Sequence, residues 1–393
     1  MLYDVLILGA GASGLAAASR GLPGWCLAEK NSEPAKKLYA TGNGRCNYMN
    51  LHAPENALAG SAEALRAGLE ALGIVGREEE EGRMYPRSGR AEDVACALIY
   101  GAKRCGTDIV CGFDAVSAVR ENGVFTVTSR EGRVLQAGKL LIACGGKAGI
   151  QYGCEGGGMR IAASFGHRVI KPIPALTTLL CEDNMALIAG VRVKAKVSLL
   201  KGRDNMVAPV MQDRGELLFG KNGLSGICIM NLSRAYRIEP DTEYYVVADI
   251  MEEYSLEQLK ALLAERCARF AQEDASFLLS SLIPSKLSDH ILSLVGIGIG
   301  RTCGSLSERE RLMIAASCKL LRFTICGSGG WKEAQVTCGG VDLAEVDPDT
   351  MESKLIPGLY FSGEVLNYDG PCGGYNLGWA FSTGFAAAEA MKK

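Results

Sequence analysis

Leu-Tyr-Asp-Val-Leu-Ile-Leu-Gly-Ala-Gly-Ala-Ser-Gly, residues 2–14, is the stretch that decides the fold of this chain. Residues 3–8 form a compact apolar run, which predicts a buried strand. The small residues at 13–19 predict a helix, and residues 25–28 predict a second strand. A strand, a G-x-G-x-x-G turn and a helix in this order predict a βαβ unit that binds a dinucleotide.

The glycines of this turn have separate physical roles. Gly9 permits the tight turn, Gly11 lets the backbone approach a diphosphate, and Gly14 lets the helix pack closely on the strand. The amino end of the helix then faces the diphosphate charge, and Ser13 offers a hydroxyl donor. Glu29 lies twenty positions after Gly9, where a carboxylate accepts hydrogen bonds from a ribose diol and repels a 2′-phosphate. The site therefore favours FAD or NAD over NADP.

The composition narrows the class of protein. The chain has 393 residues, of which 48% are hydrophobic and 22% charged, an ordinary globular mixture for two or three domains. A net charge of -2 argues against nucleic acid or an anionic membrane as the main partner. There is no apolar run of about 18 residues that would predict a spanning helix.

The 15 cysteines form no Cys-x-x-Cys pair, and the three histidines are far apart in the sequence. We therefore expect no metal site and no disulfide scaffold, but reduced thiols in the cytoplasm. We also expect a monomer or a weak homo-oligomer that acts on a small-molecule substrate.

Changes in pattern along the chain predict an interrupted α/β fold. Residues 1–170 form the first part of the dinucleotide-binding domain, with a charged, loop-like stretch at 76–90. Residues 171–325 form an insert, with a β part at about 171–250 and a helical part at about 251–325. Residues 326–393 return to the first domain and end in a helix from about Leu377.

Two further loops favour FAD over NAD, a choice that the glycine fingerprint leaves open. Residues 36–47 are rich in donors and small residues, and Arg45 is a candidate for a phosphate or flavin-carbonyl contact. Residues 369–376, Asp-Gly-Pro-Cys-Gly-Gly-Tyr-Asn, form a turn that opens the last helix. Such a helix start stabilises negative charge at one edge of a reduced flavin.

Four motifs carry a family resemblance: Tyr-Ala-Thr-Gly-Asn-Gly-Arg-Cys-Asn (39–47), Ala-Gln-Val-Thr-Cys-Gly-Gly-Val (334–341), Met-Glu-Ser-Lys-Leu-Ile-Pro-Gly-Leu-Tyr-Phe-Ser-Gly-Glu (351–364) and Gly-Gly-Tyr-Asn-Leu (373–377). With them the chain resembles bacterial FAD-dependent oxidoreductases described as BaiN-like or aminoacetone-oxidase-like. The resemblance implies a Rossmann-like FAD-binding domain of the glutathione-reductase type, with an inserted small β-barrel plus helical subdomain.

The resemblance also implies which positions lie near the cofactor. The glycine turn would contact the diphosphate, Glu29 the ribose and the backbone of Val116 the adenine, while the carboxyl-terminal motif would close the ribityl and flavin end. The full set of expected cofactor-binding residues is Gly9, Gly11, Ala12, Ser13, Gly14, Glu29, Lys30, Lys37, Thr41, Gly42, Arg45, Cys46, Asn47, Val116, Ala143, Gly145, Gly146, Gly363, Glu364, Gly374, Tyr375, Asn376 and Leu377.

Catalytic residues are harder to predict, because flavin itself carries out hydride transfer. Cys46, beside Arg45, is a candidate for a thiol of lowered pKa, and Tyr375 for a proton donor or a residue that packs on the flavin. His167 follows a glycine at a predicted helix end and is expected to be a cap or surface group. The glycines at 296–300 have the wrong spacing for a second dinucleotide site and predict a loop or helix break.

These observations predict an FAD-dependent oxidoreductase that moves a hydride between flavin and a small organic substrate. NAD(P)H, as a transient co-substrate, or dioxygen would be the other redox partner. One alternative is a non-catalytic FAD-binding protein that is regulatory or associated with RNA modification. A second alternative is an NAD-dependent dehydrogenase without flavin.

Overall fold

The computed structural model describes residues 2–203, 206–298 and 300–393. The chain divides into two compact units. Unit 1 consists of residues up to Ala175 together with Trp331–Lys393, and unit 2 is Leu176–Gly330. The insert was predicted at 171–325, so each boundary of unit 2 lies five residues further along the chain.

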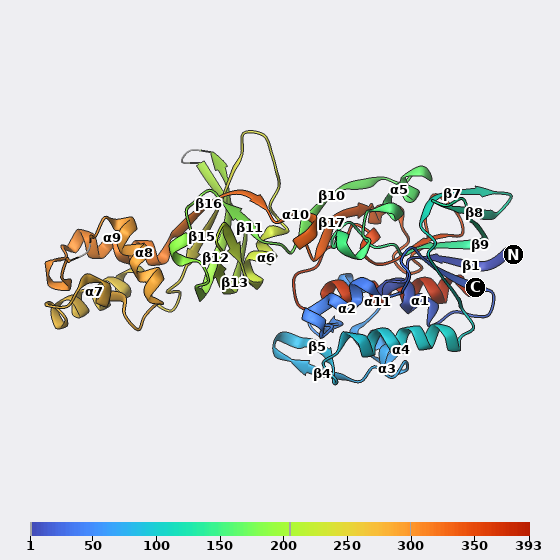
Figure 1. Ribbon diagram of the computed structural model, residues 1–393, viewed down its shortest axis with the longest axis horizontal. Helices are drawn as coiled ribbons and strands as arrows, with labels where there is room; N and C mark the ends of the chain where they lie inside the picture. Colours follow the sequence, from blue (N-terminus) through green and yellow to red (C-terminus); the bar gives the residue numbers. More distant parts are fainter. Residues whose placement is uncertain (1, 204–205, 299) are drawn as a thin grey trace. The chain divides into compact units, whose positions relative to one another are not determined.

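A sheet forms the centre of unit 1, with the strand order β6-β2-β1-β9-β8-β7 and with β18 also paired to β9. Figure 1 shows its strands β1, β9, β8 and β7 beside one another. β1 pairs in parallel with β2 and β9, β2 with β6, and β9 with β18, whereas β8 pairs antiparallel with both β9 and β7. Their bounds are β1 Leu2–Leu8, β2 Trp25–Glu29, β6 Asp108–Cys111, β7 Ala115–Glu121, β8 Val124–Ser129, β9 Val134–Ile142 and β18 Leu359–Phe361. The central strand β1 is buried along Val5–Leu8, as its apolar run predicts.

Helices cover this sheet. Their bounds are α1 Ala12–Ala18, α2 Lys36–Ala40, α3 Ala62–Glu70, α4 Ala91–Arg104, α5 Gly157–Ser164 and α11 Tyr375–Met391. α11 packs directly against α1, although the two helices are more than 350 positions apart in sequence. A Cβ atom on Gly384 would lie 2.3 Å from the Ser13 carbonyl oxygen, so only glycine permits this close approach.

A small antiparallel sheet accompanies the loop that follows α2. It contains β3 (Met49–Asn50), β5 (Arg83–Pro86) and β4 (Gly76–Glu79) in that order. The expectation of a loop at 76–90 is therefore wrong for most of that stretch. The chain leaves unit 1 along β10 (Val169–Ala175) and returns along β17 (Val336–Val341), and these two strands pair antiparallel. The predicted architecture, an α/β domain interrupted by an insert, is confirmed.

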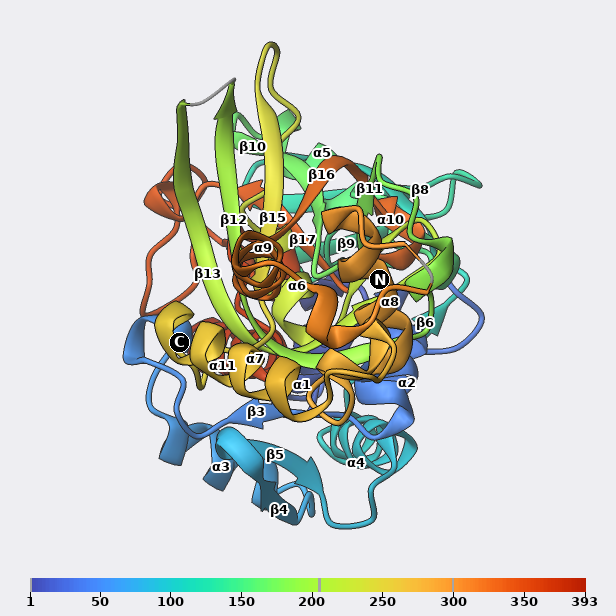
Figure 2. The same cartoon turned by 90° about the vertical axis from the view of Figure 1, so that its left-hand side faces the viewer.

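Unit 2 contains a closed antiparallel barrel of strand order β11-β14-β13-β12-β15-β16. The bounds are β11 Leu179–Cys181, β12 Arg192–Arg203, β13 Met206–Phe219, β14 Gly223–Ser225, β15 Glu243–Asp249 and β16 Leu321–Ser328. β12 and β13 form a long antiparallel pair, and Figure 2 shows the two strands beside each other. Alternate residues of β12, such as Ala195, Val197 and Leu199, are buried and fill the barrel core.

The helices of unit 2 are α6 (Ile227–Ser233), α7 (Leu256–Arg269), α8 (Ser285–Val295) and α9 (Glu308–Lys319). They share one apolar core with the barrel. α8 ends at Gly296, which takes a left-handed conformation with φ of 80°. Gly296 thus terminates α8, which agrees with the loop or helix break predicted at 296–300, although Ile299 lies outside the described residues.

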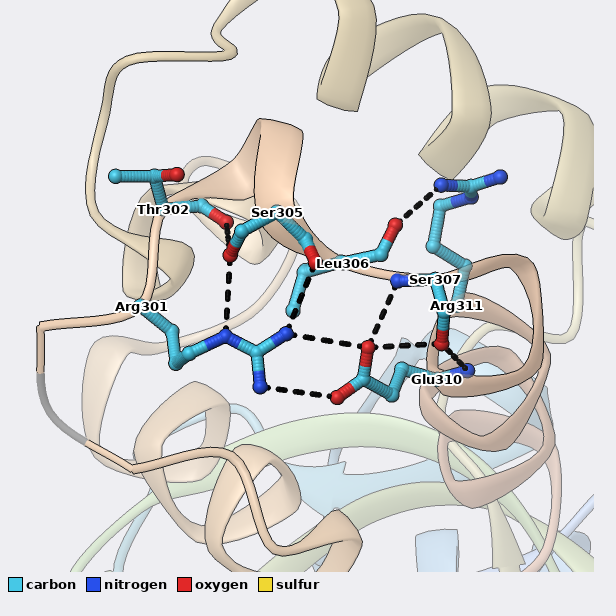
Figure 3. Close-up of polar contacts among 7 residues, drawn as sticks. All are labelled: Arg301, Thr302, Ser305, Leu306, Ser307, Glu310 and Arg311. Carbon is cyan, nitrogen blue, oxygen red and sulfur yellow. Dashed lines mark hydrogen bonds and ion pairs between the residues drawn. The ribbon is translucent and has the colours of Figure 1, made fainter.

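A charged cluster fastens the amino end of α9 (Figure 3). The guanidinium of Arg301 donates to both carboxylate oxygens of Glu310, at 3.1 and 3.2 Å. The Ser307 N–H also donates to Glu310, at 2.7 Å, and completes a capping box. Hydrogen bonds, first from the Ser307 backbone and then from the Arg301 guanidinium, hold the pKa of Glu310 at about 2. These contacts fix the loop before α9, so the cluster has a structural role.

Candidate functional site

The glycine turn between β1 and α1 lies at the carboxyl edge of the parallel strands. Gly9 has φ of 100°, and a Cβ atom there would lie 2.7 Å from the Ala143 carbonyl oxygen. A Cβ atom on Gly14 would lie 1.9 Å from the Gly9 carbonyl oxygen, whereas one on Gly11 would meet nothing within 4 Å. Gly9 and Gly14 are therefore required by the protein itself, and the free space beside Gly11 is open to a ligand.

Glu29, at the end of β2, holds this turn. Its side chain is buried, and its Oε2 accepts a hydrogen bond from the Ala10 N–H at 2.8 Å. Its Oε1 accepts from both the backbone and the side-chain amide of Asn31, at 2.8 and 2.7 Å. Because a carboxylate oxygen has two lone pairs, Oε2 keeps one acceptor position for a ribose hydroxyl.

Val116 follows a residue that contacts the backbone of Glu29. Phe113, three residues earlier, donates its N–H to the Glu29 carbonyl oxygen at 2.8 Å. The pairing of β7 with β8 shifts register between Ala115 and Ser117, so Val116 sits at a β-bulge. Val116 is 43% exposed, and the contact of its backbone with an adenine stays a prediction.

The carboxyl-terminal segment returns to the glycine turn. Gly363 has φ of 72°, and a Cβ atom there would lie 2.6 Å from the Ser13 hydroxyl oxygen. The Gly363 N–H donates to the Thr383 hydroxyl oxygen at 3.0 Å, and the Ser13 hydroxyl donates to the Ser362 carbonyl oxygen at 3.3 Å. Two stretches predicted from the sequence as parts of one site are therefore in direct contact.

Glu364, the next residue, is the centre of a partly buried polar network. Its Oε2 accepts from the Lys37 ammonium at 2.7 Å, and its Oε1 accepts from the Thr337 N–H at 2.8 Å. The Thr337 hydroxyl oxygen accepts from the N–H groups of Lys147 and Ala148, at 2.8 and 3.0 Å. Burial acts to lower the pKa of Lys37, but the Glu364 carboxylate and weaker neighbours raise it overall, so the ammonium stays charged.

Of the two glycines at 145–146, only Gly146 packs closely against this network. A Cβ atom on Gly146 would lie 2.2 Å from the Thr337 hydroxyl oxygen and 2.9 Å from the Glu364 carboxylate. A Cβ atom on Gly145 would meet nothing within 4 Å, and Ala143 before it is buried.

Lys30, after β2, forms an ion pair with Glu155 at 3.2 Å.

The loop at 41–47 turns toward the small β3-β5-β4 sheet. The Arg45 guanidinium donates to the Glu79 carboxylate at 2.5 Å and lies over the Tyr85 ring, 4.2 Å from its centroid. The Thr41 hydroxyl donates to the Leu38 carbonyl oxygen at 2.7 Å, and Gly42 takes a left-handed conformation. Arg45 thus has protein partners at the position where a phosphate or flavin contact was expected.

Cys46 does not have the expected properties of a reactive thiol. It is fully buried, and burial raises its pKa to about 12. The expected lowering of its pKa by Arg45 is wrong, because the guanidinium is directed at Glu79 instead. The thiol is neutral at physiological pH and packs in the core of unit 1.

The turn at 373–377 is held by asparagine side chains. With its amide in the orientation that satisfies both ends, Asn47 donates to the carbonyl oxygens of Met49 and Met84 and accepts from the Gly374 N–H at 3.2 Å. Asn376 accepts from and donates to the backbone of Gly370, at 2.8 and 2.9 Å. Gly374 has φ of 98° and begins α11, whose first residues Tyr375, Asn376 and Leu377 are half-buried.

Two residues make contacts that were not predicted from the sequence. Thr337 was quoted only within a motif, and the signal that it offered was a threonine beside two glycines in a strand. His167 was expected to be a cap or surface group, and this expectation is wrong. The residue is 4% exposed, and both of its ring nitrogens are hydrogen-bonded, to Glu345 at 3.0 Å and to Ser353 at 2.8 Å.

His167 should make unit 1 sensitive to acid. The Ser353 oxygen accepts from two backbone N–H groups, so its hydroxyl proton is directed at Nε2 of a neutral imidazole. Burial lowers the pKa of His167 despite the neighbouring Glu345 carboxylate. A depressed pKa means that this contribution to the free energy of unfolding is complete above about pH 6.5 and is lost as the pH falls through the folded-state pKa. Urea unfolding at about pH 7.5 and about pH 5.5 should show a smaller loss for His167→Gln than for the wild type. Equal losses in the two proteins would contradict this assignment.

The glycine turn has unpaired backbone donors at the position where a diphosphate is expected. Within residues 2–203, the backbone N–H groups of Gly11, Ala12 and Ser13 have no protein acceptor, and each lies at the amino end of α1. Unpaired donors at the start of a helix, beside the empty side of Gly11, fit an anionic ligand. The residues present therefore fit the diphosphate of a dinucleotide.

The Rossmann sheet, the glycine turn braced by Glu29 and the returning carboxyl-terminal segment define an FAD-binding protein of the Rossmann class. The chain belongs to the HI0933-like protein Rossmann domain family, whose model matches residues 3–390. This result confirms the family resemblance derived from the four motifs.

Curated relatives match over nearly the whole chain. The chain is 33% identical to the 3-dehydro-bile acid delta(4,6)-reductase of Clostridium scindens, over 98% of both chains. It is 26% identical to the ribosomal RNA dihydrouridine synthase of Escherichia coli, over 98% of this chain and 97% of that one. Among solved structures, it is similar to 3-ketosteroid-delta4-(5alpha)-dehydrogenase from Rhodococcus jostii, with a TM-score of 0.50, 13% identity and coverage of 99% and 96%. The last likeness concerns the fold alone.

None of the described helices combines the length and apolar composition needed to cross a bilayer. Within the same residues, no three His, Cys, Asp or Glu side chains are grouped so that they could hold a metal ion.

Proposed function

We propose that the chain is an FAD-dependent oxidoreductase that transfers a hydride between flavin and a small organic substrate, with NAD(P)H or dioxygen as the other redox partner. The observation that carries the proposal is the contact between Gly363 and Ser13. It joins the segment expected at the ring end of the cofactor to the turn expected at the diphosphate. A dinucleotide that spans both would lie along the carboxyl edge of the sheet.

The residues of this edge have distinct tasks in the proposed mechanism. The N–H groups of Gly11 to Ser13 bind the diphosphate, and the free acceptor position on Glu29 binds a ribose hydroxyl. Gly145 leaves room for the cofactor beside the carboxyl end of β9. The half-buried Tyr375, at the start of α11, would pack on or donate to the ring end. Bound flavin supplies the hydride acceptor and donor.

The names of the relatives suggest the kind of bond that is reduced. A 3-dehydro-bile acid with delta(4,6) unsaturation carries a C=C bond conjugated to a ketone, and uridine becomes dihydrouridine by reduction of a C=C bond conjugated to a carbonyl. We infer that this chain reduces a C=C bond conjugated to a carbonyl group in a small molecule. The higher identity to the bile-acid reductase and the net charge of -2 favour a small substrate over ribosomal RNA.

Anaerobic flavin spectroscopy tests the proposal. The purified protein should be yellow or take up FAD on reconstitution, and NADH or NADPH should bleach its visible absorbance. Addition of a 4-en-3-keto steroid should then restore the oxidised spectrum, whereas ribosomal RNA should not. A colourless protein that takes up no FAD would overturn the proposal. If ribosomal RNA alone reoxidises the flavin, the proposed substrate is ribosomal RNA and not a small molecule.

A further inference from the structure

The carboxyl edge of the sheet holds two carboxylates where a ligand with two negative charges is expected. Glu29 distributes its charge over three N–H donors. Glu364 has one N–H donor, from Thr337, and depends on the Lys37 ammonium for its second oxygen. An unpaired carboxylate beside a diphosphate would repel it, and the repulsion is strong where both groups are shielded from water.

The fold places Lys37 at this edge through local contacts. The Ala35 N–H donates to the Ala10 carbonyl oxygen at 2.8 Å, which fastens the start of α2 to the glycine turn. Lys37 lies one residue into this short helix, and its side chain reaches Glu364, 327 positions further along the chain. The two side chains are 27% and 20% exposed, so the pair is held mostly out of water. It joins α2 to the returning segment that begins at Gly363.

We propose that Lys37 is a positioning residue that neutralises Glu364, so that this carboxylate can face bound FAD without repelling its diphosphate. The inference rests on the proposed function, because it assumes that FAD binds at this edge. Thr337 and Gly146 complete the arrangement. Thr337 donates to Oε1 of Glu364, the oxygen that Lys37 does not contact, and the absence of a side chain at Gly146 leaves room for the carboxylate in this position.

A double-mutant cycle on FAD binding tests the proposal. The apoprotein is titrated with FAD, and the dissociation constant is followed by the quenching of flavin fluorescence. Lys37→Met should weaken FAD binding by about tenfold or more, because it leaves Glu364 unpaired. Lys37→Met combined with Glu364→Gln should bind FAD more tightly than Lys37→Met alone. Lys37→Arg keeps the charge and should stay within about threefold of the wild type.

A matched control is the exposed pair of Arg66 and Glu70 on α3, whose Nε–Oε1 distance is 2.8 Å. Arg66→Met should leave the FAD dissociation constant unchanged. Thermal unfolding of each apoprotein separates the two roles of Lys37. A lowered melting temperature with an unchanged dissociation constant would make the pair merely structural and overturn the proposal, as would additive losses in the double mutant. A wild-type protein that binds no FAD would instead overturn the proposed function.

Discussion

Gly11→Ala should bind FAD about a hundredfold more weakly than the wild type, with little change in the stability of the apoprotein. The backbone of Gly11 has φ of -82° and ψ of -165°, which alanine adopts without strain. A Cβ atom there meets no protein atom within 4 Å, so the fold tolerates it. The methyl group instead occupies the space where the diphosphate approaches the backbone, and a hundredfold loss corresponds to about 2.7 kcal/mol.

Gly14→Ala is the matched variant in the same turn, and its expected effect is different in kind. Its Cβ atom would lie 1.9 Å from the Gly9 carbonyl oxygen and 3.3 Å from the Ala143 side chain. Because α1 must then move away from β1, we expect the apoprotein to lose about 3 kcal/mol or more of stability. Chemical unfolding of the two apoproteins gives their free energies of unfolding. FAD titration of the folded proteins gives their dissociation constants.

The contrast between the two variants locates the ligand. If Gly11→Ala binds FAD as tightly as the wild type, the diphosphate does not dock on this turn. If Gly11→Ala unfolds as readily as Gly14→Ala, the space beside Gly11 is not free as described. Either result would also remove the basis for the role proposed for Lys37.

The first βαβ unit could be predicted because its information is local. An apolar strand, three glycines at fixed spacing and an acid at the next strand end act over fewer than thirty residues. α11 was predicted for a similar reason, since glycines precede a long run of small and apolar residues. The barrel was predicted only through the family resemblance, because the strand pattern of residues 171–250 does not specify closure.

The contacts that the sequence did not reveal are long-range. His167 binds Glu345 and Ser353, and Lys37 binds Glu364, with separations from 178 to 327 positions. No spacing rule connects such residues, and their partners depend on how the parallel strands bring segment ends together. β4 and β5 were missed because charged residues such as those at 77–81 are uncommon in strands.

Glu29→Gln should lower both the stability of the apoprotein and its affinity for FAD. Glu29 is 7% exposed, and its two carboxylate oxygens together accept three hydrogen bonds. A glutamine has one acceptor oxygen and an NH₂ group that cannot accept. In either orientation, the NH₂ group therefore faces the N–H of Ala10 or those of Asn31, and at least one buried donor loses its partner.

The expected loss of apoprotein stability is about 2 kcal/mol, since hydrogen bonds to charged groups contribute more than neutral ones. FAD affinity should fall about tenfold or more, because the glycine turn is no longer held by Ala10 and the acceptor for the ribose hydroxyl is lost. Glu155→Gln, which changes the exposed partner of Lys30 near the same strand end, is the control and should alter neither quantity appreciably. If Glu29→Gln is destabilised but binds FAD normally, Glu29 braces the turn without contacting the ribose. The dinucleotide would then lie differently along the sheet edge from the path that the fingerprint implies.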